Sequence, residues 1–295
     1  MHGIVPSLNT PFDVSGALDL ASLSKLVEHT VKTGCGGMLG LALAGEHTTL
    51  NYQEKIHFIY EVVQQNHGRI PFICNVTSTT FTETLNLTKV AAAARVDGIC
   101  VQLPTSLSLE EKLSYLDKLE KESPDIIMVQ DLDWSSEGLS LKEILFLYRR
   151  IEKFKRLKIE TSHAGPKYSA VTDATERGLK VCGGWAVTQL MDAMARSVDA
   201  FIPTGLETIF VSIYNAYRLG EEQKARKLFE SILPILTFSN QHIDISIKFF
   251  KTLRVCEGLF ESDYCRLPSA VFDPVQAQEA THATSHAMQL LSDLN

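Results

Sequence analysis

The chain has 295 residues, of which 45% are hydrophobic and 21% charged, a composition typical of a globular protein and unlike disordered or collagen-like chains. This length allows two average domains or one α/β barrel of about 250 residues with an addition. The net charge of −7, from 28 basic and 35 acidic side chains with no basic stripe, argues against nucleic acid as a partner.

The first residues lack the basic and apolar stretches of a secretory signal, and no apolar run approaches the roughly 18 residues of a membrane span. The six cysteines are dispersed without a CxxC pair. Several lie within apolar runs, where a thiol behaves as a small hydrophobe. We therefore expect a cytoplasmic protein with reduced, buried thiols and no contact with a membrane.

Eight short apolar runs, separated by segments long enough for a helix, predict strands buried on both faces of a parallel sheet. The predicted strands are 3–8, 37–43, 71–76, 98–103, 126–132, 157–161, 179–183 and 200–204. Helical periodicity in 20–31 and a capping box at Ser108-x-x-Glu111 support helices between them. Eight such units predict the α/β class and a (β/α)8 TIM barrel. A doubly wound sheet is the alternative, but no Gly-rich dinucleotide loop is present.

The alternation of predicted strands and helices stops after the eighth strand, and only helices follow. They are predicted at 207–219, 221–236, 243–257 and 275–294. The first of them completes the last βα unit. The chain is therefore predicted to form a barrel over 1–220 and a C-terminal helical extension over 221–295 that packs on the barrel.

Lys158 is the candidate with the clearest chemistry, since barrel active sites lie at the C-terminal ends of strands. Strand alternation in Leu157-Lys158-Ile159-Glu160 puts Lys158 and Glu160 on one face. An ammonium pointing into a barrel must be paired or lose its proton, and a neutral amine attacks carbonyl carbons to form a Schiff base. The alternative is that Lys158 only ends the basic run of Lys153, Lys155 and Arg156 at a solvated corner.

Six stretches, in order along residues 3 to about 268, carry a resemblance to a known family. They are 3–12 (GIVPSLNTPF), 44–51 (AGEHTTLN), 157–160 (LKIE), 179–183 (LKVCG), 200–205 (AFIPTG) and 266–268 (RLP). Together they resemble the dihydrodipicolinate synthase/N-acetylneuraminate lyase family of Schiff-base aldolases. The resemblance implies a barrel fold, Lys158 as the Schiff-base lysine, and a 2-oxo acid substrate such as pyruvate or a 2-keto-3-deoxy sugar acid. It also implies a homotetramer or homodimer. We expect no cofactor and no metal.

The chain departs from the family pattern at positions that would bind the substrate or transfer its protons. The family's paired threonines fall on Leu43 and Ala44, and a tyrosine falls on Gln130. A second tyrosine has no counterpart in 103–106, and an arginine used for a second carboxylate falls near Ser135. An amide cannot replace a phenol as an acid–base group. We therefore do not expect dihydrodipicolinate synthase activity itself.

The catalytic candidates are Lys158 and Gln130, the latter orienting the intermediate. The predicted substrate-binding residues are Leu43, Ala44, Gly45, Asp131, Glu160, Gly183 and Ile202. Asp131, Glu160 and His163 are candidates for an acid that replaces the family tyrosine. Asp131 could instead be a salt-bridge partner facing a helix, and His163 could be an exposed loop residue. Trp185 either lines the substrate pocket or has only a packing role.

Two other hypotheses stay open beside the lyase. One is a degenerate barrel that binds a metabolite without turnover, which the lost threonines and tyrosines motivate. The other uses Lys158 as a base without covalent chemistry. His282 and His286, four residues apart, are interpreted as ordinary helix surface rather than metal ligands.

Overall fold

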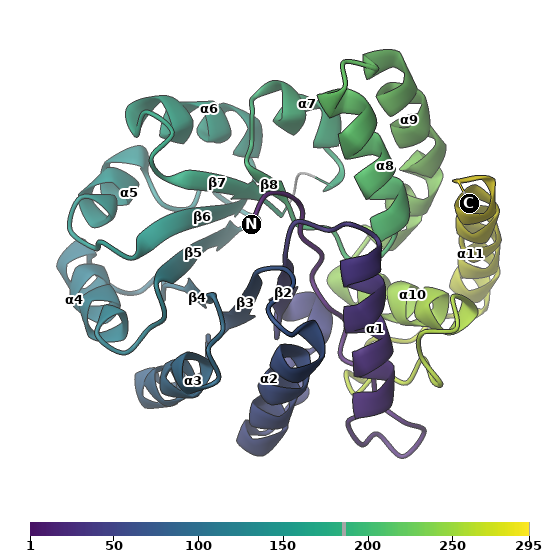
Figure 1. The fold of residues 1–295 in the computed structure, drawn as a ribbon, viewed down its shortest axis with the longest axis horizontal. Helices are drawn as coiled ribbons and strands as arrows, with labels where there is room; N and C mark the ends of the chain where they lie inside the picture. Colours follow the sequence, from purple (N-terminus) through teal and green to yellow (C-terminus); the bar gives the residue numbers. More distant parts are fainter. Residues whose placement is uncertain (185–186, 295) are drawn as a thin grey trace. The chain divides into compact units, whose positions relative to one another are not determined.

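The computed structural model of the chain describes residues 1–184 and 187–294, which cluster into two compact units. The first unit comprises Met1–His2 and Pro71–Ile202, and the second comprises Gly3–Ile70 and Pro203–Asn295. Strands and helices alternate along the chain from β1 to α8, as the labels in Figure 1 show. The alternation is that of the predicted βα units.

The sheet of the first unit is built from parallel strands that pair in chain order. The strands are β3 (Phe72–Asn75), β4 (Gly98–Gln102), β5 (Ile126–Asp133), β6 (Phe154–Thr161), β7 (Lys180–Gly183) and β8 (Ala200–Phe201). Apolar residues on both faces are fully buried, for example Ile127 and Met128 on β5. This explains why the strands read as continuous apolar runs. Strand β8 is shorter than predicted, and Pro203, which lacks an N–H, follows it closely.

The helices of the first unit connect these strands. They are α3 (Phe81–Ala93), α4 (Leu109–Glu120), α5 (Leu141–Tyr148), α6 (Ala164–Ala174) and α7 (Leu190–Ala195). The predicted capping box of α4 is confirmed, since Ser108 and Glu111 exchange side-chain-to-backbone hydrogen bonds. The same device begins α5 at Ser140 and Glu143.

The second unit combines an N-terminal and a C-terminal part of the chain. Its elements are β1 (Gly3–Ile4), α1 (Leu20–Lys32), β2 (Met38–Gly40), the 3-10 turns η1 (Leu43–Gly45) and η2 (His47–Thr49), α2 (Tyr52–Asn66), α8 (Glu207–Arg218), α9 (Glu222–Ser239), α10 (Ile243–Cys256) and α11 (Pro274–Leu294). The predicted strand 37–43 is too long, because Leu41 adopts a left-handed backbone conformation (φ 56°) that ends the extended run. Leu43 therefore begins a 3-10 turn instead of ending a strand.

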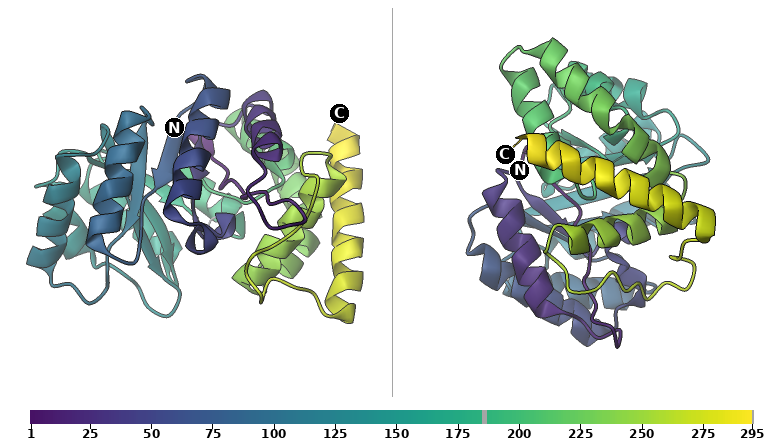
Figure 2. Two further views of the ribbon diagram at one scale, coloured as in Figure 1. Left: turned by 90° about the horizontal axis from the view of Figure 1, so that it is seen from below. Right: turned by 90° about the vertical axis from the view of Figure 1, so that its right-hand side faces the viewer.

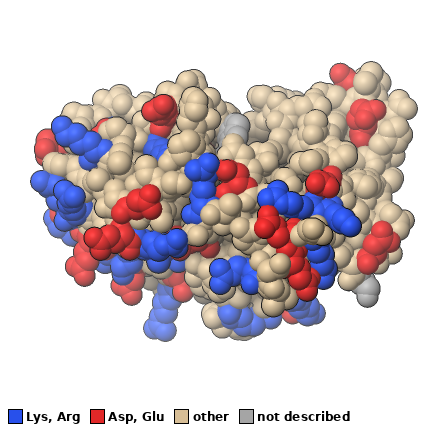
Figure 3. Space-filling model, turned by 90° about the horizontal axis from the view of Figure 1, so that it is seen from above, with Lys and Arg blue, Asp and Glu red and all other residues tan. Residues whose placement is uncertain are grey.

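The C-terminal helices α9, α10 and α11 pack against one another, and the two views of Figure 2 show α11 in yellow beside α10. Each of them lies within three residues of its predicted bounds. The predicted division of the chain at residue 220 stays a prediction. On the face drawn in Figure 3, basic and acidic side chains are interspersed, so this face presents no field of a single sign.

Candidate active site

Strand β6 carries Lys158 in its middle and buries it. The strand begins at Phe154, so Lys155 and Arg156 belong to the strand, whereas Lys153 precedes it. Lys158 is 5% exposed, and the alternating Leu157 and Ile159 are 0% exposed. The structure thus places an amine among buried groups.

Glu160 and Gln130 surround this amine. Lys158 Nζ donates to Glu160 Oε2 at 2.8 Å, and Gln130 Nε2 donates to the same oxygen at 2.5 Å. Gln130 lies directly opposite Lys158 in the register of β5 and β6. We call Lys158, Glu160 and Gln130 the Lys158 cluster. A carboxylate that accepts from both an ammonium and an amide is held in one position and can exchange a proton with the amine.

Two thiols that the sequence analysis treated only as core residues lie near the cluster. Cys182 lies opposite Lys158 on β7, and the charge of Lys158 acts on the pKa of the Cys100 thiol on β4. Burial raises the pKa of Cys100 to about 12 and that of Cys182 to about 11. Both thiols therefore stay protonated near neutral pH, and the charge beside Lys158 comes from Glu160.

Gly184 makes room for the Glu160 side chain. A Cβ added at Gly184 would lie 2.2 Å from Glu160 Oε1 and 2.4 Å from Cδ. Any side chain at this position would displace the carboxylate. The sequence analysis named Gly183 but missed its neighbour, and the Gly-Gly pair at a strand end was the available signal.

Tyr168 on α6 was also missed. The side chain is fully buried, and its hydroxyl has no hydrogen-bond partner among the described residues. Burial, and then the charge of Glu160, raise the pKa of this phenol. A protonated phenol on a helix therefore lies within electrostatic reach of the Lys158 cluster.

Asp131 lies on the other side of β5 from Gln130. Its Oδ2 accepts from Lys167 Nζ at 2.5 Å and its Oδ1 from the Leu139 N–H at 2.8 Å. Burial raises the pKa of Asp131 against the opposing effect of Lys167. This is the geometry of a salt-bridge partner facing a helix, and a role in substrate binding stays a prediction. His163 is exposed at the start of α6.

The other predicted residues of the first unit lie at the ends of β7 and β8. Gly183 is opposite Ile159 of β6 and accepts the N–H of Ile202 at 3.0 Å. Ile202 is buried. Their contact with substrate stays a prediction. Trp185 lies outside the described residues.

Leu43, Ala44 and Gly45 lie in the second unit and form the turn η1. Asn9 Nδ2 donates to the Ala44 carbonyl at 3.1 Å, and Thr10 Oγ1 donates to the Gly45 carbonyl at 2.6 Å. The Gly45 N–H is bonded to the Ala42 carbonyl. The turn is therefore held rigidly by side chains from the start of the chain, and its predicted contact with a substrate carboxylate stays a prediction.

Glu46, the next residue, anchors this turn through a buried ion pair. Lys251 on α10 donates to Glu46 Oε2, and both side chains are 0% exposed. Glu46 Oε1 accepts the N–H groups of Arg266 and Leu267 at 2.8 and 3.0 Å. Lys251 also donates to the Tyr264 carbonyl at 2.9 Å. Every polar atom of the pair is thus satisfied within the second unit.

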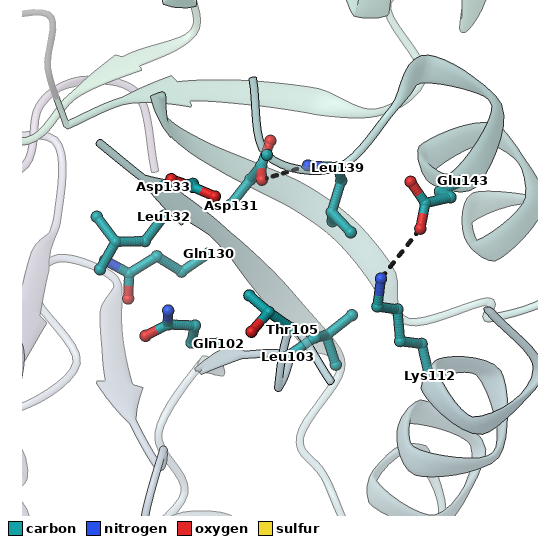
Figure 4. Close-up of a pocket in the computed structure, with 11 residues that line it drawn as sticks. Gln102, Leu103, Thr105, Lys112, Gln130, Asp131, Leu132, Asp133, Leu139 and Glu143 are labelled. Carbon is teal, nitrogen blue, oxygen red and sulfur yellow. Dashed lines mark hydrogen bonds and ion pairs between the residues drawn. The ribbon is translucent and has the colours of Figure 1, made fainter. Parts of the chain in front are cut away.

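A cavity of about 230 Å³ lies between the C-terminal ends of β4 and β5 and the helices that follow them. Figure 4 shows Gln102 and Gln130 pointing to the same side, whereas Asp131 points toward Leu139. The lining residues are Gln102, Leu103, Thr105, Lys112, Gln130, Asp131, Leu132, Asp133, Gly138, Leu139 and Glu143. Through Gln130 the cavity adjoins the Lys158 cluster.

Within residues 1–184 and 187–294, no three His, Cys, Asp or Glu side chains gather in a way that could hold a metal ion. His286 contacts the Ser231 carbonyl at 2.7 Å, and His282 lies 3.9 Å from Glu279. In the same part of the chain, no helix is long and apolar enough to cross a membrane.

Known proteins resemble this chain in sequence. The dihydrodipicolinate synthetase family matches residues 1–288. The 4-hydroxy-tetrahydrodipicolinate synthase of Pseudomonas aeruginosa is 31% identical over 144 residues, which are 49% of this chain and 44% of that relative. The matched segment therefore spans less than half the length of that protein.

Solved structures resemble the chain over nearly its whole length. Dihydrodipicolinate synthase from Rhodopseudomonas palustris has a TM-score of 0.88 at 20% identity and 97% coverage of both chains. N-acetylneuraminate lyase from Mycoplasma synoviae has a TM-score of 0.82 at 18% identity, covering 97% of this chain and 98% of its own. These likenesses confirm the (β/α)8 barrel with a C-terminal helical extension. The match over residues 1–288 shows that this chain belongs to the dihydrodipicolinate synthetase family.

Proposed function

We propose that this chain is a lyase or aldolase-type enzyme in which Lys158 forms a Schiff base with a 2-oxo acid. The substrate would be pyruvate or a 2-keto-3-deoxy sugar acid. The observation that carries the proposal is the Lys158 cluster, in which a buried amine lies 2.8 Å from a carboxylate able to take its proton. Family membership supports a lyase of this type.

In the proposed reaction, Glu160 takes a proton from the Lys158 ammonium, and the neutral amine attacks the C2 carbonyl carbon of the 2-oxo acid. The carbinolamine loses water when Glu160 returns the proton to its hydroxyl group. As the C3–C4 bond breaks, Glu160 takes the proton of the C4 hydroxyl, C4 leaves as a carbonyl compound, and the electron pair moves into the protonated imine to form an enamine. Glu160 then returns the proton to C3, which restores the protonated imine; in the direction of bond formation these steps run in reverse. Water adds to C2 of the imine, and its hydrolysis releases the 2-oxo acid and regenerates the amine.

Gln130 holds the carboxylate that performs these proton transfers. Its amide donates to Glu160 Oε2 and cannot exchange a proton itself. The proton transfer that a family tyrosine at this position would perform therefore passes to Glu160. This difference supports a reaction other than that of dihydrodipicolinate synthase.

The remaining parts of the proposal concern binding and assembly. Leu43, Ala44 and Gly45 are proposed to face the substrate carboxylate, and Gly183, Ile202 and Asp131 to line the substrate pocket. We propose a homotetramer or homodimer in the cytoplasm. The buried free thiols Cys35, Cys74, Cys100 and Cys182 support a reducing compartment.

Borohydride trapping tests the covalent step. Folded protein is incubated with a panel of 2-oxo acids, led by pyruvate, then reduced and analysed by peptide mass spectrometry. We expect an adduct of the mass of the reduced ligand on Lys158. Lys155→Ala, an exposed lysine of the same strand, is the matched control and keeps the adduct. Lys158→Ala loses it.

The opposite result would change the function assigned. A folded protein that binds a 2-oxo acid with neither an adduct at Lys158 nor turnover would be a non-catalytic, metabolite-binding member of the family, and turnover without an adduct would make Lys158 a base without covalent chemistry. Turnover by Lys158→Ala at the parent rate would exclude a Schiff base at this residue.

A further inference from the structure

The face of β5 opposite Gln130 carries a group of contacts that the proposed reaction does not use. Lys167 on α6 donates to Asp131 Oδ2 at 2.5 Å and also to the Glu137 carbonyl. The N–H of Leu139 donates to Asp131 Oδ1 at 2.8 Å, and Figure 4 shows Asp131 directed toward Leu139. We call Lys167, Asp131 and the two backbone groups the Lys167 clamp.

The ion pair of the clamp is largely enclosed. The Lys167 side chain is 12% exposed and that of Asp131 is 3% exposed. Burial raises the pKa of Asp131, the charge of Lys167 opposes this, and the charge of Asp133 adds to it. Without the ammonium, a buried carboxylate would be left uncompensated, which is strongly unfavourable. Lys167 is therefore the cation that keeps Asp131 in its place.

The segment that follows β5 closes tightly over the clamp. Gly138 has a positive φ of 63°, and a Cβ added there would lie 2.2 Å from Asp131 Oδ1 and 2.8 Å from Thr161 Cγ2. The N–H and the hydroxyl of Ser162 donate to the Ser136 carbonyl at 3.2 and 2.9 Å. This segment is thus docked on the residues that link β6 to α6, and the ion pair lies beneath it.

The clamp and the Lys158 cluster share the backbone of β5. Asp131 follows Gln130 directly, so strand alternation puts the two side chains on opposite faces. A displacement of Asp131 must therefore move Gln130 as well. The Gln130 amide lies 2.5 Å from Glu160 Oε2, and a shift of about 1 Å would break that hydrogen bond. Misplacement of this size can lower a catalysed rate about a hundredfold.

We infer that Lys167 is a positioning residue, which fixes the end of β5 through Asp131 and the Glu137 carbonyl and so holds Gln130 against the Glu160 carboxylate. The inference rests on the proposed Schiff-base function, because Glu160 is the proposed proton carrier. Lys167 acts from the far side of the strand and has no contact with the 2-oxo acid in this scheme.

Lys167→Met tests the inference, since it keeps an unbranched side chain and removes the charge. The rate constant of borohydride-trapped adduct formation at saturating pyruvate is expected to fall ten- to a hundredfold. The half-saturating pyruvate concentration should change less than threefold, because Lys167 does not contact the ligand. Lys180→Met is the matched control with a rate within twofold of the wild type, since it breaks the Lys180–Asp199 pair where β7 begins.

A double-mutant cycle separates positioning from a general structural role. Gln130→Met removes the amide that the clamp is inferred to hold. In that background, Lys167→Met should slow adduct formation by no more than threefold. A larger further loss, or a rate within threefold of the wild type for the single Lys167→Met variant, overturns the inference.

Lys167→Met must first be shown to fold, by near-UV circular dichroism and thermal unfolding. If it does not fold, Lys167→Met is combined with Asp131→Asn. The combined variant has no uncompensated charge and still lacks the clamp, so the same loss of rate is expected. A rate within threefold of the wild type again overturns the inference.

The proposed function and the clamp can fail separately. If the wild-type protein forms no adduct at Lys158, the Schiff-base proposal fails, and the clamp is then judged by hydrogen–deuterium exchange of peptides that span 128–139. Exchange at least tenfold faster in Lys167→Met, with the Lys180→Met control unchanged, supports the hold on β5 and Gln130. Exchange at the wild-type rate overturns it.

Discussion

Lys158 and Lys251 are both buried lysines bonded to a glutamate, yet their surroundings differ. Lys251 and Glu46 are 0% exposed, and Lys251 has a second acceptor in the Tyr264 carbonyl and lies 4.3 Å from the Phe12 ring centroid. Burial lowers the pKa of Lys251 more than Glu46 raises it.

The Lys158 side chain is 6% exposed and that of Glu160 is 16% exposed, and the glutamine beside them lines a cavity. The enclosed pair fixes a turn, whereas the Lys158 cluster adjoins a cavity through Gln130. Burial alone therefore does not separate the lysine proposed to be catalytic from the structural one; the neighbouring cavity does.

The largest expected effect is on the chemistry of the Lys158 cluster. Glu160→Gln keeps the size of the side chain and removes the proton acceptor, so the rate of borohydride-trapped adduct formation is expected to fall about 10²- to 10⁴-fold. Rapid-quench trapping with pyruvate at several pH values measures it. A rate within threefold of the wild type would show that another group, with Tyr168 the next candidate, moves the proton.

Lys251→Met is expected to act on stability instead of chemistry. It leaves Glu46 buried without its cation, which costs about 3–5 kcal/mol of unfolding free energy. Urea denaturation measures the change, and Lys25→Met, which breaks the exposed pair with Glu261, is the control at about 0–1 kcal/mol. The double variant with Glu46→Gln should recover part of the loss. A loss no larger than that of the control would remove the contrast between the two lysines.

The imidazole of His47, next to Glu46, is expected to make the folding stability of the second unit depend on pH. Burial lowers its pKa from 6.5 to about 4. Above pH 6.5 the imidazole is neutral in both states, and between pH 6.5 and 4 the unfolded chain binds a proton that the folded chain does not. Stability should therefore fall as the pH falls through this window, by about 2 kcal/mol, since the half-buried ring keeps some contact with water.

Unfolding titrations at pH 7 and pH 4.5 measure this loss, and His47→Gln should remove that share of it. If the variant loses as much stability as the parent over this interval, other groups are responsible for the acid sensitivity.

A smaller effect on the chemistry of the Lys158 cluster is expected from Gly184→Ala. The added Cβ forces Glu160 away from its place beside Lys158, and adduct formation is expected to slow about ten- to a hundredfold. In a Glu160→Ala background the same change should have no further effect, which trapping rates of the four proteins in the cycle will show. An equal effect in both backgrounds would mean that Gly184 acts on something other than Glu160.

Much of the fold could be predicted because its signals are local. Apolar runs such as 98–103 mark buried strands, and the period of two along 157–160 puts Lys158 and Glu160 on one face. The Ser108 capping box needs only four consecutive residues. Strand ends were less predictable. Leu41, for example, turns into a left-handed conformation that no local pattern signals.

By itself, therefore, the sequence determined the succession of strands and helices, the class of the fold and the lysine with reactive potential. Only the tertiary structure decided which groups surround that lysine. Gln130 contacts Glu160 across 30 residues of chain, and Lys251 meets Glu46 across 205. Side-chain period is a property of neighbouring residues, but register and packing arise from segments far apart in the chain, so they appear only in the folded molecule.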